Sequence, residues 1–360
     1  MDNDTLLNAF TKRTPSDFTT LSLMPNQMCN FSCRYCYSAE GRSSKVIDKA
    51  ILHKGLDFFI DRQRIASQTL KMFVSGGGEP FVTQDITCHA LEYAHERAQE
   101  QGFQLWASVV TNGSIVNDKI INVLKQYGTS VCVSFEVLED LQEQLRGRYR
   151  TVSETLASYG KAGVPTMVNS TITPLSVNRI EEMTEMLLKQ YPFVRSFTVE
   201  PVTDYRLFPT PAHLADFYRQ FMRGYLKIKQ QYGDSKTEIW CSMEQMTAAP
   251  RRRYCPGKLC LTPEGTFTIC HCATSSKEER YEHCVYGKID GNGVSFDLGK
   301  FHELLNINAS TMKRCNNCIA KMNCGGECMT RIDLYPSEYM DEVCNFNRKW
   351  FEYHNKQQSV

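Results

Sequence analysis

The sequence predicts an α/β protein with a partly closed barrel of parallel strands, followed by a separate cysteine-rich domain. Three observations support this. Short apolar runs alternate with helical patterns up to about residue 230, the sequence texture changes near residue 235, and the 360 residues include 16 cysteines. Strands that alternate with helices typically form βα units around a parallel sheet. Six such units are too few for a closed eight-stranded barrel, so we expect a partial (β/α)6 barrel.

The predicted elements follow one another in βα order. We expect strands at residues 20–24, 70–74, 105–111, 130–135, 166–173 and 196–201. We expect helices at residues 46–62, 87–101, 118–127, 151–162, 179–191 and 212–231. The predicted domains are an N-terminal extension (1–18), the barrel (19–235), the cysteine-rich domain (236–350) and a C-terminal tail (351–360). Active residues are expected where the parallel strands end.

Charge and cysteine content narrow the possible functions. The 41 basic residues nearly balance the 40 acidic ones, which argues against a general nucleic-acid or membrane-surface binder. No apolar stretch is long enough to span a membrane, and the first residues lack the apolar core of a secretion signal. We therefore expect a cytoplasmic protein, in which many cysteines indicate metal or redox chemistry rather than disulfides.

The first cysteine motif follows the first predicted strand and comprises Cys29, Cys33 and Cys36. Three closely spaced thiolates can bind three irons of a 4Fe–4S cluster and leave the fourth iron open to a substrate. A zinc site is the alternative, but structural zinc takes four protein ligands. The spacing therefore favours an iron–sulfur cluster with one open iron.

This motif, with an aromatic residue at Tyr35, resembles the signature of the radical S-adenosylmethionine (SAM) enzymes. The second predicted strand ends in a segment similar to that family's GGE motif, which receives the SAM amino group: Gly76, Gly77, Gly78 and Glu79. Glycines suit such a motif because the backbone itself must approach the ligand. The resemblance also implies SAM-binding roles for Asn112, at the end of the third strand, and for Ser134 and Arg146, which would contact the SAM carboxylate or ribose.

The C-terminal cysteines resemble the SPASM extension of a subset of radical SAM enzymes. This resemblance implies one auxiliary cluster on Cys255, Cys260, Cys270 and Cys328, and a second on Cys315, Cys318, Cys324 and Cys344. Cys272 competes with Cys260, because residues two apart on a strand share a face. Zinc-ribbon chemistry is the alternative for paired cysteines. We interpret the remaining thiols as ordinary buried residues: Cys88, Cys132, Cys241 and Cys284.

The resemblance implies three 4Fe–4S clusters and SAM as cofactors, and a peptide as substrate. The expected reaction is reductive cleavage of SAM to a 5′-deoxyadenosyl radical, followed by hydrogen abstraction from a residue of a ribosomally made peptide. A carbon–carbon, thioether or ether cross-link then forms with the help of the auxiliary clusters. We expect flavodoxin or ferredoxin as reductant, and leader recognition by a separate protein or by the SPASM surface.

Two further functions compete with peptide cross-linking. Anaerobic sulfatase maturases oxidise Cys or Ser to formylglycine, and the resemblance places their usual Asp base where this chain has His271. His271 and Glu136, which follows the fourth strand, are the candidate proton acceptors. An iron–sulfur electron carrier without SAM chemistry is the alternative from another class, but it would need closed clusters and no SAM site.

Overall fold

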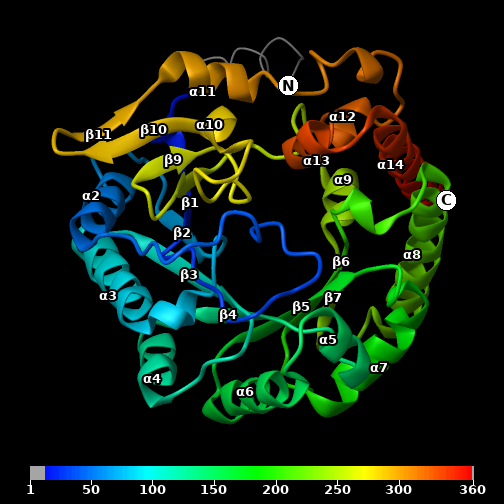
Figure 1. Ribbon diagram of the computed structural model, residues 1–360, viewed down its shortest axis with the longest axis horizontal. Helices are drawn as coiled ribbons and strands as arrows, with labels where there is room; N and C mark the ends of the chain where they lie inside the picture. Colours follow the sequence, from blue (N-terminus) through cyan, green and yellow to red (C-terminus); the bar gives the residue numbers. More distant parts are fainter. Residues whose placement is uncertain (1–12, 359–360) are drawn as a thin grey trace.

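The computed structural model describes residues 13–358 and contains an open sheet of eleven strands (Figure 1). The strand order is β11-β10-β9-β8-β1-β2-β3-β4-β5-β6-β7, and the strands from β8 to β7 run parallel. The strands are β1 Thr20–Leu23, β2 Thr69–Val74, β3 Gln104–Thr111, β4 Ser130–Ser134, β5 Thr166–Ile172, β6 Ser196–Pro201, β7 Glu238–Trp240, β8 Leu259–Leu261, β9 Thr266–Thr268, β10 Val285–Asp290 and β11 Gly293–Phe296. The six predicted strands are confirmed as β1 to β6.

The six predicted helices are also present, and shorter ones join them. The helices up to the end of the barrel are α2 Lys49–Phe59, α3 Gln84–Glu100, α4 Asp118–Gln126, α5 Glu139–Leu145, α6 Tyr149–Ala162, α7 Ile180–Gln190 and α8 Pro211–Tyr232. The later helices are α9 Gln245–Ala248, α10 Tyr281–Cys284, α11 Leu298–Leu305, α12 Lys321–Cys324, α13 Met329–Leu334 and α14 Ser337–Gln358. Among the helices of residues 13–358, none has the length and apolar character that a membrane crossing requires.

Local sequence explains where the barrel helices begin and which face they bury. The side chain of Asn117 accepts a hydrogen bond from the N–H of Ile120 at 3.0 Å and so caps the first turn of α4. Ile120, Val123 and Leu124 recur at helical spacing, and all three are buried against the sheet. Helix α2 also begins at a capping residue, Asp48, whose carboxylate accepts hydrogen bonds from two backbone N–H groups.

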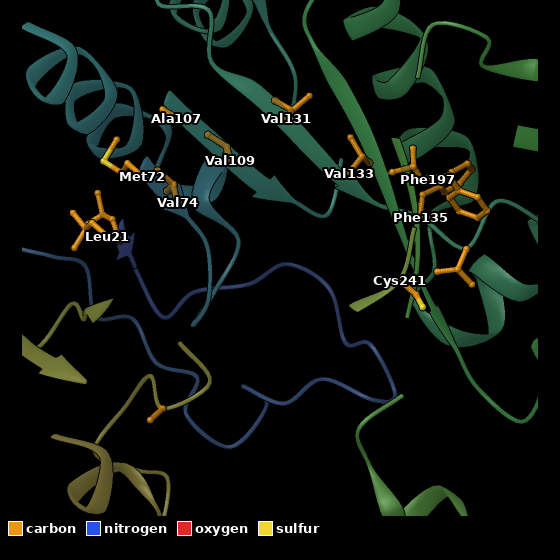
Figure 2. Close-up of a cluster of buried hydrophobic side chains, with 14 of the residues drawn as sticks. Leu21, Met72, Val74, Ala107, Val109, Val131, Val133, Phe135, Phe197 and Cys241 are labelled. Atoms are coloured by element: carbon orange, nitrogen blue, oxygen red, sulfur yellow. The ribbon is translucent and has the colours of Figure 1, made fainter. Parts of the chain in front are cut away.

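Alternate positions of the parallel strands form the hydrophobic core (Figure 2). Met72 and Val74 of β2 and Val131 and Val133 of β4 are fully buried, and Figure 2 shows them in one continuous cluster with neighbouring strands. The intervening positions of β5 and β6 are only half-buried and are mostly polar. Because side chains alternate between the faces of a strand, the second face of these strands is available for a polar site.

The sheet continues across the boundary predicted near residue 235. β7 pairs with β6, and β8 pairs in parallel with β1 through Leu21 opposite Leu259 and Leu23 opposite Leu261. Two short parallel strands therefore extend the six predicted ones, one at each side. Pairing satisfies backbone groups that would otherwise be exposed at the sheet edges. It also joins the cysteine-rich region to the barrel in one sheet.

The end of the chain packs against the barrel. Helix α14 lies alongside α8, with the rings of Phe346 and Tyr218 stacked at 4.3 Å between centroids (Figure 1). Residues 351–358, which the sequence analysis separated as a tail, continue α14 as a helix. Residues 1–12 of the predicted N-terminal extension lie outside the described residues.

Candidate active site

The loop after β1 carries Cys29, Cys33 and Cys36 on one irregular segment. All three thiols are half-buried, and the 16 cysteines of the chain, which all lie within the described residues, form no disulfide. The guanidinium of Arg42 donates to Sγ of Cys36 at 3.3 Å. Burial raises the pKa of Cys33, and the positive charge of Arg146 opposes that shift. Closely spaced thiols beside two fixed positive charges fit the anionic donor set that an iron–sulfur cluster requires.

The glycine-rich turn after β2 packs directly against the cysteine loop. The backbone N–H of Glu79 donates to the carbonyl oxygen of Met28 at 2.6 Å, and the side-chain amide of Asn26 donates to the carbonyl oxygen of Glu79 at 3.0 Å. Gly77 adopts a φ of 71°, and a Cβ added there would lie 2.7 Å from the carbonyl oxygen of Asn26. Only glycine fits this position, because a side chain would be strained and would collide with backbone. Gly76 and Gly78 complete the turn on either side.

The carboxylate of Glu79 is buried and ties the ends of β2 and β3 together. It accepts hydrogen bonds from the hydroxyl of Thr111 at 2.7 Å and from the N–H of Asn112 at 2.6 Å. Burial raises the pKa of Glu79, and these hydrogen bonds oppose the shift. The side chain of Asn112 donates to Oδ1 of Asn30 at 2.9 Å and lies 3.8 Å from Sγ of Cys29. Glu79 therefore has a structural role through its side chain, and Asn112 contacts the cysteine loop.

Replacing Gly77 by alanine should damage both folding and SAM binding. Gly102 is a matched control, because it has a similar φ of 69° but no atom within 4 Å of an added Cβ. We expect Gly77→Ala to lower the free energy of unfolding by about 1–3 kcal/mol more than Gly102→Ala, since only Gly77 meets backbone. Thermal unfolding and SAM calorimetry on both variants measure this. If the two variants have the same free energy of unfolding and the same Kd for SAM, the glycine turn is not part of the SAM site.

A buried charged network links Tyr35 of the cysteine loop to the end of β4. The Tyr35 hydroxyl donates to the Glu136 carboxylate, while the guanidinium of Arg146 donates to the Tyr35 oxygen at 2.8 Å and lies 3.7 Å from Glu136. Glu136 is fully buried and the side chain of Arg146 is 9% exposed. Burial raises the pKa of Glu136, and Arg146 opposes the shift. This geometry favours Glu136 and Arg146 as residues that position Tyr35, and their predicted roles as base and SAM ligand stay predictions.

The sheet face that carries Ser134 also carries a carboxylate that the sequence analysis missed. Ser134 lies opposite Asn169, Asn169 lies opposite Thr198, and Glu200 follows two residues further along β6. Residues two apart on a strand share a face, so Glu200 lies on the Ser134 face, nearer the carboxyl end. The N–H and hydroxyl of Ser242 donate to its two oxygens, each at 2.7 Å. Burial raises the pKa of Glu200 to about 7, which suits proton transfer near neutral pH.

Glu200 should make the stability of the protein fall as the pH rises. Its pKa is about 7 in the folded chain against an ordinary value of 4.5, so folding favours the protonated form. The contribution of protonated Glu200 to the free energy of unfolding is fully present below about pH 4.5 and is lost as the pH rises through 7. Between pH 5 and pH 8, we expect the free energy of unfolding of Glu200→Gln to rise by up to about 3 kcal/mol relative to that of the natural chain.

Thermal unfolding of both proteins across this pH range measures the effect of Glu200. The exposed Glu238 of β7 provides a matched control, and Glu238→Gln should follow the pH profile of the natural chain. Parallel pH profiles for Glu200→Gln and the natural chain would contradict the prediction.

His271 lies beside the glycine turn and the cysteine loop. A Cβ added to Gly76 would lie 2.9 Å from the carbonyl oxygen of His271, and the ring of Tyr37 meets the His271 ring edge-on at 6.1 Å between centroids. Nζ of Lys258, which the sequence analysis missed, lies 3.0 Å from Nδ1 of His271. The charge of Lys258, and then burial, lower the pKa of His271 to about 4. His271 is therefore near the expected site but is a weaker base than a free imidazole.

Electrostatic contacts link four cysteines from separate segments, three of them through Cys270 or Cys260. Burial raises the pKa of Cys260 on β8, and the thiolates of Cys270 and Cys255 raise it further, against the charge of Lys258. Burial, and then the Cys270 thiolate, raise the pKa of Cys328. This donor set fits a four-thiolate cluster, and it contains the residues that the SPASM resemblance implies for the first auxiliary cluster.

A second group of cysteines lies around α12 and α14. Burial raises the pKa of Cys315, and the thiolates of Cys344 and Cys318 add to the shift. Burial, the Glu327 carboxylate and then the Cys344 thiolate raise the pKa of Cys324. These four thiols also fit a four-thiolate cluster.

Cys272 competes with Cys260 in the structure as well as in the sequence. The N–H of Cys272 donates to Sγ of Cys270 at 3.4 Å, and the donor atoms of Cys270, His271 and Cys272 all lie within 4.8 Å of one another. Cys260 is fully buried in the middle of β8. Both thiols are therefore near Cys270. Of the remaining cysteines, Cys132 is half-buried and the others are buried: Cys88, Cys241 and Cys284.

Comparison with known proteins identifies the barrel. A family model described as the radical SAM superfamily matches residues 23–187, which include the cysteine loop, the glycine turn and the network of Tyr35, Glu136 and Arg146. Residues 23–187 are a radical SAM domain. The predicted resemblance to the radical SAM enzymes and the predicted fold class are thus confirmed, and this domain indicates an enzyme.

The curated relatives of this chain include a maturase. A serine-type anaerobic sulfatase-maturating enzyme of Klebsiella aerogenes is 27% identical over 135 residues, which are 37% of this chain and 33% of that protein. The matched part therefore spans about a third of the length of this relative. A 22% identical uncharacterised protein of Methanocaldococcus jannaschii matches 47% of this chain and 58% of its own length.

Two solved structures share the fold over most of the chain. Native anSMEcpe with bound AdoMet and Kp18Cys peptide superimposes with a TM-score of 0.72 at 14% identity, covering 95% of this chain and 99% of that one. Streptococcus suis SuiB bound to precursor peptide SuiA gives a TM-score of 0.60 at 15% identity, covering 93% and 76%. At these identities the likeness shows the fold alone.

Proposed function

We propose that this radical SAM enzyme oxidises a ribosomally made peptide and forms a carbon–carbon, thioether or ether cross-link in it. The observation that carries the proposal is that β8, which contains Cys260, pairs with β1, the strand that leads into the cysteine loop, while His271 lies against the glycine turn. Cross-linking is a net oxidation, so it needs an electron acceptor near the substrate. Auxiliary clusters in the two groups would supply one.

The proposed site divides the work between the cofactors and the chain. When bound, the cluster on Cys29, Cys33 and Cys36 and SAM supply reductive cleavage and a radical that abstracts hydrogen. The backbone carbonyl groups of the glycine turn would accept hydrogen bonds from the SAM amino group. Tyr35, kept in place by Glu136 and Arg146, would fix the loop beside it.

The peptide gives up two hydrogens when a cross-link forms. One leaves as an atom, and the other leaves as a proton and an electron. Glu200 fits the proton-accepting role because its pKa is about 7 and its oxygens lie on the Ser134 face of the sheet. His271 is the second candidate, although the charge of Lys258 lowers its basicity.

Oxidation of a Cys or Ser residue to formylglycine is the second candidate function. The similarity to the sulfatase-maturating enzyme of Klebsiella aerogenes and the fold shared with anSMEcpe favour it. The proposed cluster-binding cysteines are compatible with either reaction, since both reactions oxidise a peptide. The proposal includes a reducing compartment such as the cytoplasm, a flavodoxin or ferredoxin as reductant, and leader recognition by a separate protein or the cysteine-rich surface.

Mass spectrometry of the modified peptide tests the function. The reconstituted enzyme is incubated anaerobically with SAM, a reductant and peptides encoded beside its gene or derived from sulfatases. A cross-link removes two hydrogens and retains sulfur, whereas formylglycine gives an aldehyde that reacts with hydrazides. Formylglycine as the sole product would overturn the cross-linking proposal, and a peptide left unmodified while SAM is cleaved would overturn both.

A further inference from the structure

Two histidines face each other on the outer helical layer, between α2 and α3. Nε2 of His53 on α2 lies 2.8 Å from Nε2 of His89 on α3, and the two ring centroids are 5.0 Å apart. Figure 1 shows these two helices side by side on the outside of the sheet. We propose that His53 and His89 form a binding site for a divalent transition-metal ion of the zinc type.

The ring of His53 is held in place by a chain of contacts. It stacks on Tyr93 with 4.1 Å between centroids and 11° between planes. The Tyr93 hydroxyl donates to Asp57 at 2.9 Å, and Asp57 pairs with Arg97 at 3.2 Å. Stacking restricts the rotation of the His53 ring, and a histidine held in its ligating orientation binds metal more tightly than a freely rotating one. The ring of His53 is therefore preorganised and does not rotate like a free surface side chain.

The protonation state of the pair suits metal binding. Burial, and then the neighbouring His53, lower the pKa of His89, which favours the neutral imidazole that ligates metals. Glu92, one turn along α3, is within electrostatic range of His89 and adds negative charge beside the pair. The two imidazoles would be the protein ligands, and water molecules would complete the coordination of the ion.

The distance between the two nitrogens is close to the one that a metal ion would impose. With zinc–nitrogen bonds of about 2.0–2.1 Å and tetrahedral angles, two ligating nitrogens lie about 3.3 Å apart. The observed 2.8 Å needs to widen by about half an ångström, which small rotations of the half-buried rings provide. A bound ion would tie α2 to α3 and stabilise their packing against the barrel.

Zinc titration of the full-length, cluster-loaded protein tests the site in solution. The proposed cluster ligands are then occupied by iron, and the variants compared have the same cysteines. His53→Gln and His89→Gln should each raise the Kd for one equivalent of zinc at least about tenfold. His95→Gln is the matched control, because His95 also lies on α3 but stacks on Tyr127 instead of another histidine. It should bind zinc like the natural chain, and zinc should raise the Tm of both.

Anomalous diffraction from zinc-soaked crystals provides the second measurement. We expect one peak about 2.1 Å from Nε2 of both His53 and His89, absent from His89→Gln crystals. Equal zinc stoichiometry in all four proteins, or a Kd weaker than about 1 mM, would overturn the proposal. In that case a hydrogen bond alone joins the two rings. These outcomes do not depend on the peptide reaction, which is measured separately.

Discussion

Replacing Cys29, Cys33 and Cys36 together by alanine is expected to abolish SAM cleavage while leaving iron in both C-terminal groups. The three thiols lie on one loop, and the other eight proposed ligands lie beyond residue 254. Iron content should therefore fall from about twelve to about eight irons per chain. The 5′-deoxyadenosine formed with dithionite should fall to background, because the proposed SAM-cleaving cluster has no other protein ligands. Iron analysis and chromatography of the nucleoside measure the two effects.

A cysteine outside the three groups provides the control for this experiment. Cys88 is buried on α3 and belongs to no group, so Cys88→Ala should retain about twelve irons and cleave SAM at the natural rate. Continued 5′-deoxyadenosine formation by the triple variant would show that the loop does not hold the SAM-cleaving cluster. Loss of all iron from the triple variant would show that the three groups are not independent.

Cys328→Ala and Cys344→Ala are expected to damage different auxiliary clusters. Cys324 and Cys328 lie in one short segment, but Gly325, Gly326 and Glu327 between them all have positive φ angles, of 72°, 97° and 77°. The chain therefore turns sharply between the two thiols. The Cys270 thiolate raises the pKa of Cys328, whereas the Cys344 thiolate raises the pKa of Cys324. This partition matches the ferredoxin arrangement in which the last cysteine of a run ligates the other cluster.

Each variant should lose about four irons, retain SAM cleavage and lose most peptide product. Electron paramagnetic resonance of the reduced proteins should show a different auxiliary signal missing in each. Cys284→Ala is the control, because Cys284 is a fully buried thiol of the same region. A structure in which Cys315, Cys318, Cys324 and Cys328 bind one metal would refute the partition. Identical spectra for the two variants would also refute it.

The elements of the barrel were predictable because their determinants are local. The six predicted strands and six predicted helices all appear, with ends that differ by a few residues. Apolar spacing and caps such as Asn117 act within a few residues, so they can be read from the chain. The cysteine spacing of the first loop and the glycine turn are equally local, and both lie inside the matched radical SAM domain.

Residues without a motif escaped the sequence analysis. Glu200 has an ordinary strand as its context, and only the register of β5 and β6 shows that it shares a face with Ser134. Lys258 lowers the pKa of His271 through a contact with it, and the two residues are thirteen positions apart in the chain. Glu136 was a candidate base in the sequence, but its contacts with Tyr35 and Arg146 favour a positioning role.

By itself, the sequence determined the βα order of the barrel, the two kinds of cysteine group and the radical SAM chemistry that the first group indicates. Only the tertiary structure decided that the cysteine-rich region joins the barrel through β8 and β1, and that His271 meets the glycine turn. Only the fold brought His53 to His89. The physical reason is that periodicity and spacing depend on neighbours along the chain, whereas strand pairing, burial and pKa depend on residues brought together by folding.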